Sequence, residues 1–157
     1  MIVLAGVGAI LAVAVLIFLL PPGQITDDVA VGRVDEVEAR QVVYIEQHRL
    51  YVVATGDGFT ALDDDSRHVG DRVLYCKTSG TFSSPAHGEF FDPQGRYLGG
   101  PASGDLGRYP VIVRDGQIFV KLDGLQLPSR SSTPYQPTGP LCGGPEDPPG
   151  FYSDGLA

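Results

Sequence analysis

Two short stretches of the chain decide its fold, Ser66-Arg67-His68-Val69-Gly70 and Ser84-Pro85-Ala86-His87-Gly88. Each begins with serine, carries a histidine two or three residues later and ends in glycine. Residues 69–83 separate His68 from Ser84. Glycine and proline favour turns, so both stretches are predicted to be loops between strands.

Short strand-like segments surround these loops. Strands are predicted at residues 41–46, 49–54, 58–62, 72–76, 89–91, 96–98, 109–113 and 117–122, where apolar and polar residues alternate or β-branched and aromatic residues follow one another. The segments Asp92-Pro93-Gln94-Gly95 and Arg114-Asp115-Gly116-Gln117 predict tight turns. No segment after residue 20 has helical periodicity over ten residues. We expect an all-β head of small stacked antiparallel sheets.

The first twenty residues contain no charged side chain. As a helix they would span about 30 Å, the thickness of the hydrocarbon core of a bilayer. The alternative is a cleaved signal peptide, but the run lacks a basic start and a small-x-small cleavage site. The sequence therefore predicts a single transmembrane helix at 1–20, a linker at 21–31 and a β domain at 32–127.

Length and charge limit the classes of function. A chain of 157 residues fits one globular head. The formal net charge is −8, and all of it lies outside the apolar N-terminal run. An acidic head lacks the basic patches that bind nucleic acid or anionic lipid. We expect no nucleic-acid partner, and contact with membrane lipid through residues 1–20 only.

The chain has two cysteines, Cys76 and Cys142, and neither belongs to a Cys-x-x-Cys pair. In an oxidising compartment they could form a disulfide that ties the C-terminal region to the head. The alternative is a buried Cys76 and a free Cys142. Both interpretations stay open at the level of sequence, because the distance between the sulfurs is not known.

Residues 128–157 form a segment rich in Ser, Pro and Gly. Such a composition does not build its own core. One interpretation is a disordered tail. The other is an extended arm whose aromatic residues, Tyr135, Phe151 and Tyr152, bind a partner.

The two loops, taken with residues further along the chain, resemble the Rieske iron-sulfur family. The spacer between them has the length of the one in the family's pattern Cys-x-His, Cys-x-x-His. The run from His87 to Asp92, the loop Gly99-Gly100-Pro101-Ala102 and the run Arg108-Tyr109-Pro110-Val111 match later parts of the family in the same order. The resemblance covers residues 34–125 and implies the layout of a membrane-anchored cytochrome bc iron-sulfur subunit.

The resemblance also shows what this chain lacks. In the family, each loop supplies one cysteine thiolate and one histidine to a two-iron cluster. Here His68 and His87 match, whereas Ser66 and Ser84 stand at the cysteine positions. A serine hydroxyl stays protonated and is a poor substitute for soft sulfur. We therefore expect no bound cofactor and treat these four positions as vestiges of the cluster site.

Two other uses of these residues are possible. His68 and His87 could hold zinc or copper if an aspartate from Asp63-Asp64-Asp65 or Asp71 joined them. A serine of either loop could pair with a histidine as in a hydrolase, but no Gly-x-Ser-x-Gly motif or phosphate loop is present. We expect that the protein is not an enzyme. The simplest expectation is that serines and histidines hydrogen-bond one another and keep the loops closed.

The functional expectation follows from the resemblance and the missing cysteines. We expect a non-redox accessory subunit that stabilises a larger respiratory or photosynthetic membrane complex and binds its integral membrane subunits. It would sit in a bacterial-type inner membrane as a single-pass protein with a periplasmic head. One alternative is an electron-transfer protein with an unusual Ser/His-ligated cluster or a mononuclear metal. Another is a tethered binding domain with a soluble partner.

Overall fold

The computed structural model describes residues 28–131 of the chain. They form eleven strands, one short α-helix and two 3-10 turns. None of the helices within 28–131 is long and apolar enough to cross a membrane. The predicted membrane helix, residues 1–20, lies outside the described residues. The elements are β1 (Asp28–Arg33), α2 (Val34–Arg40), β2 (Val42–Ile45), η1 (Glu46–His48), β3 (Leu50–Thr55), β4 (Gly58–Asp63), β5 (Leu74–Cys76), β6 (Thr81–Ser84), β7 (Glu89–Phe91), β8 (Tyr97–Gly99), β9 (Arg108–Tyr109), β10 (Val111–Arg114), β11 (Gln117–Lys121) and η2 (Leu122–Gly124).

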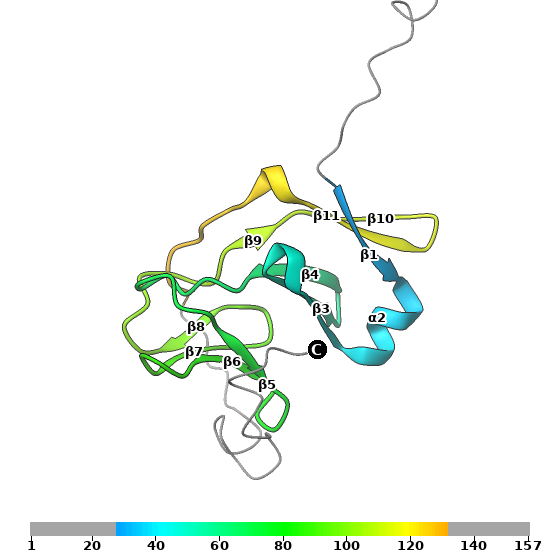
Figure 1. The fold of residues 1–157 in the computed structure, drawn as a ribbon. Coiled ribbons are helices and arrows are strands. Elements are labelled where there is room, and N and C mark those ends of the chain that lie inside the picture. Colours follow the sequence, from blue (N-terminus) through cyan, green and yellow to red (C-terminus); the bar gives the residue numbers. More distant parts are fainter. Residues whose placement is uncertain (1–27, 132–157) are drawn as a thin grey trace, which may run out of the picture.

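The strands form three antiparallel sheets, which lie one after another across the head (Figure 1). The first contains β1, β11 and β10 in that order. The second has the order β2-β3-β4-β9 and lies in the middle, and the third has the order β5-β6-β7-β8. The predicted all-β head of small stacked sheets is confirmed.

Strand β3 holds the stack together because both of its faces are buried. Side chains of a strand alternate between its two faces. Leu50 and Val52 therefore belong to one hydrophobic core, and Tyr51 and Val53 to the other. The first core lies toward β11 and α2, where it includes Ile118, Val120 and Val37. The second lies toward the third sheet.

The second core carries the end of the molecule that holds the two serine-histidine loops. Its large buried side chains include Phe82 from β6 and Phe91 from β7. The ring of Tyr51 meets the ring of Phe82 edge-on, with 4.9 Å between centroids. The Tyr51 hydroxyl also donates a hydrogen bond of 3.1 Å to the carbonyl of Val73. Apolar burial and a satisfied polar group together fix the third sheet on the middle one.

Two strands and the α-helix of the structure were not predicted from the sequence. Strand β1 begins at Asp28, inside the predicted linker at 21–31, and pairs with β11. Strand β6 reads Thr-Phe-Ser-Ser, a polar run whose four residues are all buried. Helix α2 has only seven residues, and the Glu36 carboxylate accepts a hydrogen bond from the Arg33 amide at its start. A helix this short shows no full period in the sequence.

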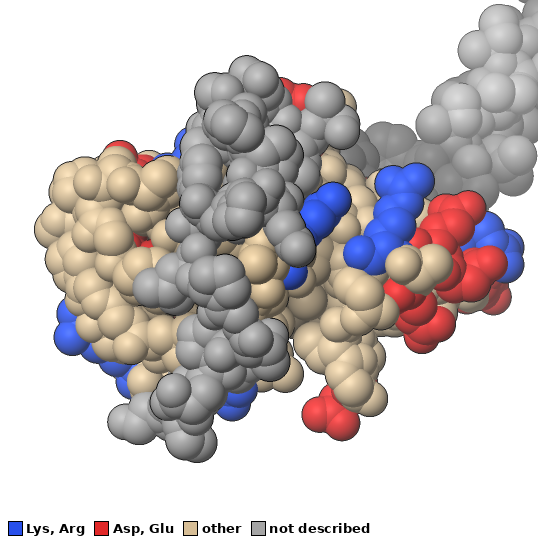
Figure 2. Space-filling view, turned by 90° about the horizontal axis from the view of Figure 1, so that it is seen from below, with Lys and Arg blue, Asp and Glu red and all other residues tan. Residues whose placement is uncertain are grey.

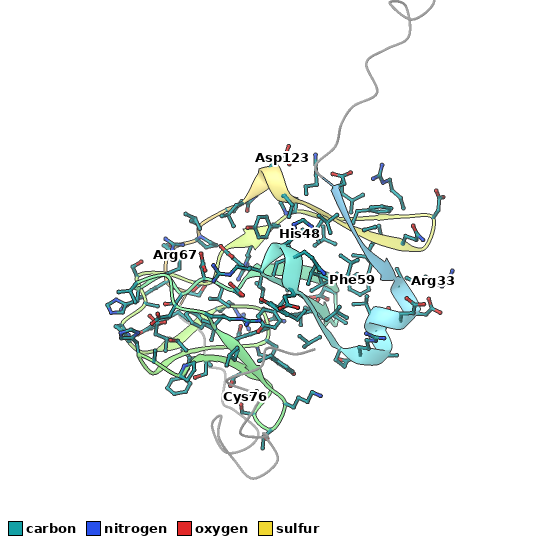
Figure 3. The ribbon with its side chains drawn as sticks, viewed as in Figure 1. Arg33, His48, Phe59, Arg67, Cys76 and Asp123 are labelled. Atoms are coloured by element: carbon teal, nitrogen blue, oxygen red, sulfur yellow. The ribbon has the colours of Figure 1, made fainter. Side chains whose placement is uncertain are left out.

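Three loops meet at one end of the third sheet. The Gly99-Gly100-Pro101-Ala102 loop contacts the second serine-histidine loop so closely that a Cβ on Gly100 would lie 2.7 Å from the Cα of Glu89. The same loop contacts the first serine-histidine loop, because the Ser103 hydroxyl donates to the carbonyl of Arg67 at 2.6 Å. In Figure 3, Arg67 lies at the end of the head away from Arg33.

The last described residues return to the third sheet. The Ser131 amide donates to Oδ1 of Asp105 at 2.8 Å, and the Arg130 guanidinium lies 4.3 Å from the centroid of the Tyr97 ring on β8. Burial alone would raise the pKa of Asp105, but hydrogen bonds from Ser131 and Tyr97 outweigh this and lower it. The start of the predicted arm at 128–157 is thus fixed beside β8.

The close approach at Gly100 can be tested by two glycine substitutions. Gly100 has φ +96° and faces backbone atoms, whereas Gly116 has φ +73° and no atom within 4 Å of the point where a Cβ would lie. We expect Gly100→Ala to lower the free energy of unfolding by about 2–4 kcal/mol, and Gly116→Ala by about 1 kcal/mol, because only the first adds a clash to the strained φ. Urea denaturation measures both values. Equal losses would contradict the contact between the loops.

Candidate functional site

The two serine-histidine loops connect strands as the sequence predicted. Residues 66–70 lie between β4 and β5, and residues 85–88 connect β6 to β7. Each loop is closed by a backbone hydrogen bond from its glycine, Gly70 to Ser66 at 3.2 Å and Gly88 to Ser84 at 2.9 Å. Both glycines have positive φ, a conformation that glycine adopts without steric cost. The two glycines therefore allow the tight backbone turns that close the loops.

The loops bring the two histidines side by side. The ring centroids of His68 and His87 are 5.2 Å apart, and the rings meet at 76°. Both residues are exposed at the tip of the loops. This end of the head thus presents a pair of imidazoles to solvent, next to the exposed side chain of Val69.

The two serines lie beneath the histidines and are buried. Ser66 is 5% exposed and Ser84 is fully buried. The Ser66 hydroxyl donates a short hydrogen bond to Oε2 of Glu89, and it accepts a 3.1 Å bond from the amide of His68. The Ser84 hydroxyl has no hydrogen-bond partner among residues 28–131.

Glu89 is a functional candidate that the sequence did not reveal. It is the first residue of β7 and pairs with Ser84 across the β6–β7 ladder. Its side chain is completely buried, and its Oε1 has no partner within the described part of the chain. A buried carboxylate requires donors, and the Ser66 hydroxyl supplies one. A sequence signal for Glu89 exists only through the second loop. If that loop is predicted to be a hairpin turn, Glu89 is expected opposite Ser84.

A second contact joins the loops at the surface. Nδ1 of His87 and Oδ2 of Asp71 form a short hydrogen bond. The expected hydrogen bonds between serines and histidines are found only within the first loop, where Ser66 accepts from the His68 amide, and within residues 28–131 none joins a serine to a histidine across the two loops. Two contacts with carboxylates join the loops. Ser66 of the first loop donates to Glu89, which follows the second loop, and His87 of the second loop bonds to Asp71, which follows the first.

The acidic run Asp63-Asp64-Asp65 is the one group of three such side chains within 28–131 whose potential ligand atoms all lie within 4.8 Å. Asp64 is held by groups of the chain itself. It accepts from the Tyr44 hydroxyl at 2.7 Å and forms ion pairs with Arg49 at 2.9 Å and Arg72 at 3.3 Å. Burial raises the pKa of Asp64, and burial together with the bond to Asp64 raises the pKa of Tyr44 to about 12. The run is part of an ion-pair network, and it does not reach His68 or His87.

Cys76 ends β5 on the side of the third sheet away from the histidine loops (Figure 3). It is disulfide-bonded, and the described residues contain no free cysteine. Cys142 lies outside the described residues, as do the aromatic residues of the predicted arm, Tyr135, Phe151 and Tyr152.

The bond between Ser66 and Glu89 predicts unequal effects of removing the two buried hydroxyls. Ser66→Ala leaves the Glu89 carboxylate buried without its donor, and we expect a loss of about 1–3 kcal/mol in the free energy of unfolding. Ser84→Ala removes a hydroxyl that has no partner among the described residues, so its cost should stay below about 1 kcal/mol. Denaturant titrations of both variants provide the comparison. A larger loss for Ser84→Ala would be incompatible with this geometry.

Comparison with known proteins agrees with the architecture. No family model matches the chain. The cytochrome b6-f complex iron-sulfur subunit of Chlorobaculum tepidum is 27% identical over 129 residues, which cover 76% of this chain and 71% of that protein. The crystal structure of the plasma membrane Rieske protein PetC3 of Synechocystis is 32% identical with a TM-score of 0.52, covering 59% of this chain and 98% of that chain.

A hyperthermophilic respiratory complex III structure is 20% identical with a TM-score of 0.48, covering 74% of this chain and 94% of that chain. The likeness to PetC3 is decisive, because identity above 30% extends over nearly all of that protein. On this ground, and with both histidine loops in place, the chain belongs to the Rieske iron-sulfur protein family.

Proposed function

We propose that this chain is a Rieske-like subunit without an iron-sulfur cluster, which stabilises a larger energy-converting membrane complex. The proposed membership in a membrane complex is supported by a relative that is a subunit of a cytochrome b6-f complex. The chemistry of the two loops supports the loss of the cluster. The chain thus shares the β head with its family and differs from it at the two cysteine ligands.

One observation carries the proposal, the hydrogen bond between Ser66 and the buried Glu89. A two-iron cluster needs two thiolates from the protein in addition to two imidazoles. At this site the two thiolate positions carry the hydroxyls of Ser66 and Ser84. The hydroxyl of Ser66 already forms a hydrogen bond to the carboxylate of Glu89. A hard, protonated oxygen beside a buried carboxylate does not fit the soft, electron-rich iron-sulfide core. The residues present do not fit the cluster.

Side chains of the protein do what a cluster would otherwise do for the loops. The Ser66–Glu89 contact joins them in the interior, and the Asp71–His87 contact joins them at the surface. The Gly99–Ala102 loop packs against the second of them. Together these three contacts hold the tip of the head closed.

An electron-transfer protein with another metal centre remains the second candidate. The observation that favours it is the 5.2 Å separation of the His68 and His87 rings, at an exposed tip. Two imidazoles are fewer than the three or four ligands of a stable zinc site. Moreover, Asp71 already occupies Nδ1 of His87, and no third ligand joins this pair in the described residues. We therefore favour the scaffold.

A catalytic role finds no support at the same loops. A serine nucleophile needs a base within hydrogen-bond distance. Ser84 has no hydrogen-bond partner within residues 28–131. Ser66 has the Glu89 carboxylate beside it, but both side chains are buried, so a substrate does not reach the hydroxyl. Within the described part of the chain neither hydroxyl bonds to the imidazole ring of His68 or His87, since Ser66 contacts His68 only through its backbone amide. We propose that the protein is not an enzyme.

The proposed location follows from the relatives and the N-terminal run. A membrane-associated relative such as the plasma membrane protein PetC3 supports a membrane location. We propose that residues 1–20 cross a bacterial-type inner membrane once, with the head on the periplasmic side. The helix would contact lipid and the integral membrane subunits of the complex, and Tyr135 of the arm is available for contact with a neighbouring subunit.

Reconstitution tests the loss of the cluster. The full chain, purified in detergent under nitrogen, is incubated with iron and sulfide beside the Synechocystis Rieske protein as a positive control. We expect no visible absorption band and no paramagnetic signal after reduction, because two thiolates are missing. A cluster signal in this chain would overturn the proposal, and a signal from one bound metal ion would support the second candidate.

The scaffold role is tested separately. Native mass spectrometry of the tagged chain, released gently from its own membrane, is expected to show it bound to integral membrane subunits. Deleting the chain is expected to lower the amount of the intact complex by severalfold. Release of the chain as a monomer, together with an unchanged complex in the deletion strain, would contradict the role.

A further inference from the structure

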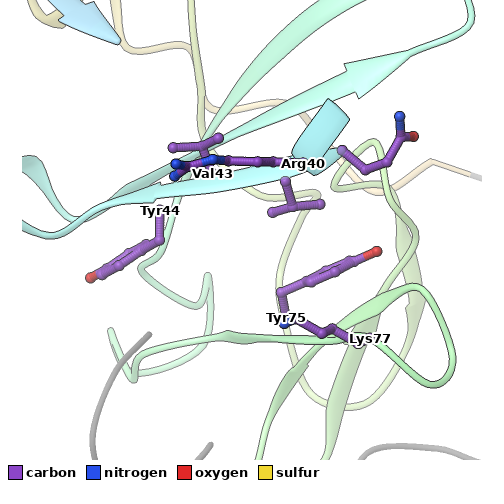
Figure 4. A pocket seen from close by; sticks show the side chains of 7 residues that line it. Arg40, Val43, Tyr44, Tyr75 and Lys77 are labelled. Atoms are coloured by element: carbon purple, nitrogen blue, oxygen red, sulfur yellow. The ribbon is translucent and has the colours of Figure 1, made fainter. Parts of the chain in front are cut away.

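A groove of about 540 Å³ lies between two sheets, away from the histidine loops. One wall comes from residues 40–44, at the end of α2 and along β2. The other comes from Tyr75 and Lys77 (Figure 4), which flank Cys76 on either side. Both walls belong to sheet edges, because β2 and β5 are outer strands of the second and third sheets. An extended segment of chain is a natural cover for two neighbouring edges.

The groove is cationic and aromatic. Arg40 and Lys77 are exposed, and neither has an ion-pair partner within residues 28–131. The side chains of Tyr44 and Tyr75 line the groove from opposite walls (Figure 4). Seen from below, acidic side chains gather at the end of the head where α2 lies, with basic side chains beside them (Figure 2). An occupant should therefore combine carboxylates with proline or aromatic rings.

The sequence after Cys142 has this chemistry. Residues 143–152 read Gly-Gly-Pro-Glu-Asp-Pro-Pro-Gly-Phe-Tyr, so Glu146 and Asp147 follow the cysteine by four and five residues. Residues 132–157 contain no lysine or arginine. Four extended residues reach about 13 Å, far enough to bring Glu146 from a bond at Cys76 to the cations of the groove.

The disulfide identifies this segment as the occupant. Cys76 is disulfide-bonded, and Cys142 is the other cysteine of the chain. Such a bond forms when two thiols pass two electrons and two protons to the disulfide of an oxidoreductase. We propose that residues 143–152 of this chain lie in the groove between β2 and β5, held by a Cys76–Cys142 disulfide and by contacts of Glu146 and Asp147 with Arg40 and Lys77.

The length of the chain permits this path. Ser131 is fixed near β8 through Asp105, and β5 is the opposite edge of the same four-stranded sheet. Three strand spacings amount to about 14 Å. The eleven residues from Ser131 to Cys142 reach about 36 Å when extended, so the bond closes without strain on the head.

This proposal does not depend on the loss of the cluster. It places Phe151 and Tyr152 on the head of the same chain and leaves Tyr135, which precedes Cys142, for a neighbouring subunit. It also gives the outer strands of two sheets a covalently held cover, which protects them from pairing with another molecule.

A zero-length cross-link tests the proposal. The chain contains two lysines, Lys77 in the groove and Lys121 on β11 in the first sheet. Carbodiimide joins a lysine amine to a carboxylate in direct contact. With the full chain in detergent, peptide mapping is expected to find Lys77 joined to Glu146 or Asp147 at least about tenfold more often than Lys121 is. The Glu146→Gln, Asp147→Asn double variant should lose this product.

Two further measurements complete the test. Peptide mapping without reductant should recover Cys76 bonded to Cys142 within one chain. In a variant that ends at Ser131, amide hydrogen exchange in β2 should become about tenfold faster, while β3 keeps its protection and so reports an intact fold. Free thiols, a dimer bridged by disulfides, equal yields from Lys77 and Lys121, or unchanged exchange in β2 would each overturn the proposal.

Discussion

The hydrogen bond from Ser66 to Glu89 is the contact on which the tip of the head depends. It joins the loop between β4 and β5 to the start of β7, and it does so in the interior, where a carboxylate without a donor is costly. In the Rieske family a metal cluster joins the same loops through thiolates and imidazoles. This chain keeps the imidazoles and the shape of the loops, and it closes them with an oxygen–oxygen contact.

The rest of the structure supports this contact from below. Both faces of β3 are buried, so the third sheet has a rigid base on which Phe82 and Phe91 pack. The Gly99–Ala102 loop closes against Glu89 from the side, where only glycine fits at position 100. The exposed histidines at the tip are thus presented by loops that the Ser66–Glu89 and Asp71–His87 contacts join. Such a head can serve as a docking shape within a larger assembly.

Much of this architecture could be predicted from the sequence. Turn residues and alternating apolar residues indicated most of the strands, and the order of the loops identified the family. The Ser66–Glu89 contact could not be predicted, because its partners are 23 residues apart and no local pattern connects them. Strand β6 was missed because Thr81, Ser83 and Ser84 are polar, although burial between sheets overrides that preference. The groove depends on two sheet edges that only the fold brings together.

The most direct test of the account is the content of iron and acid-labile sulfide in the full chain, purified without oxygen from its own membrane. The account predicts less than about 0.1 iron and 0.1 sulfide per chain, because Ser66 and Ser84 replace the thiolates that a two-iron cluster requires. Values near two of each per chain would contradict it. They would show that the hydroxyls of this site hold a cluster after all.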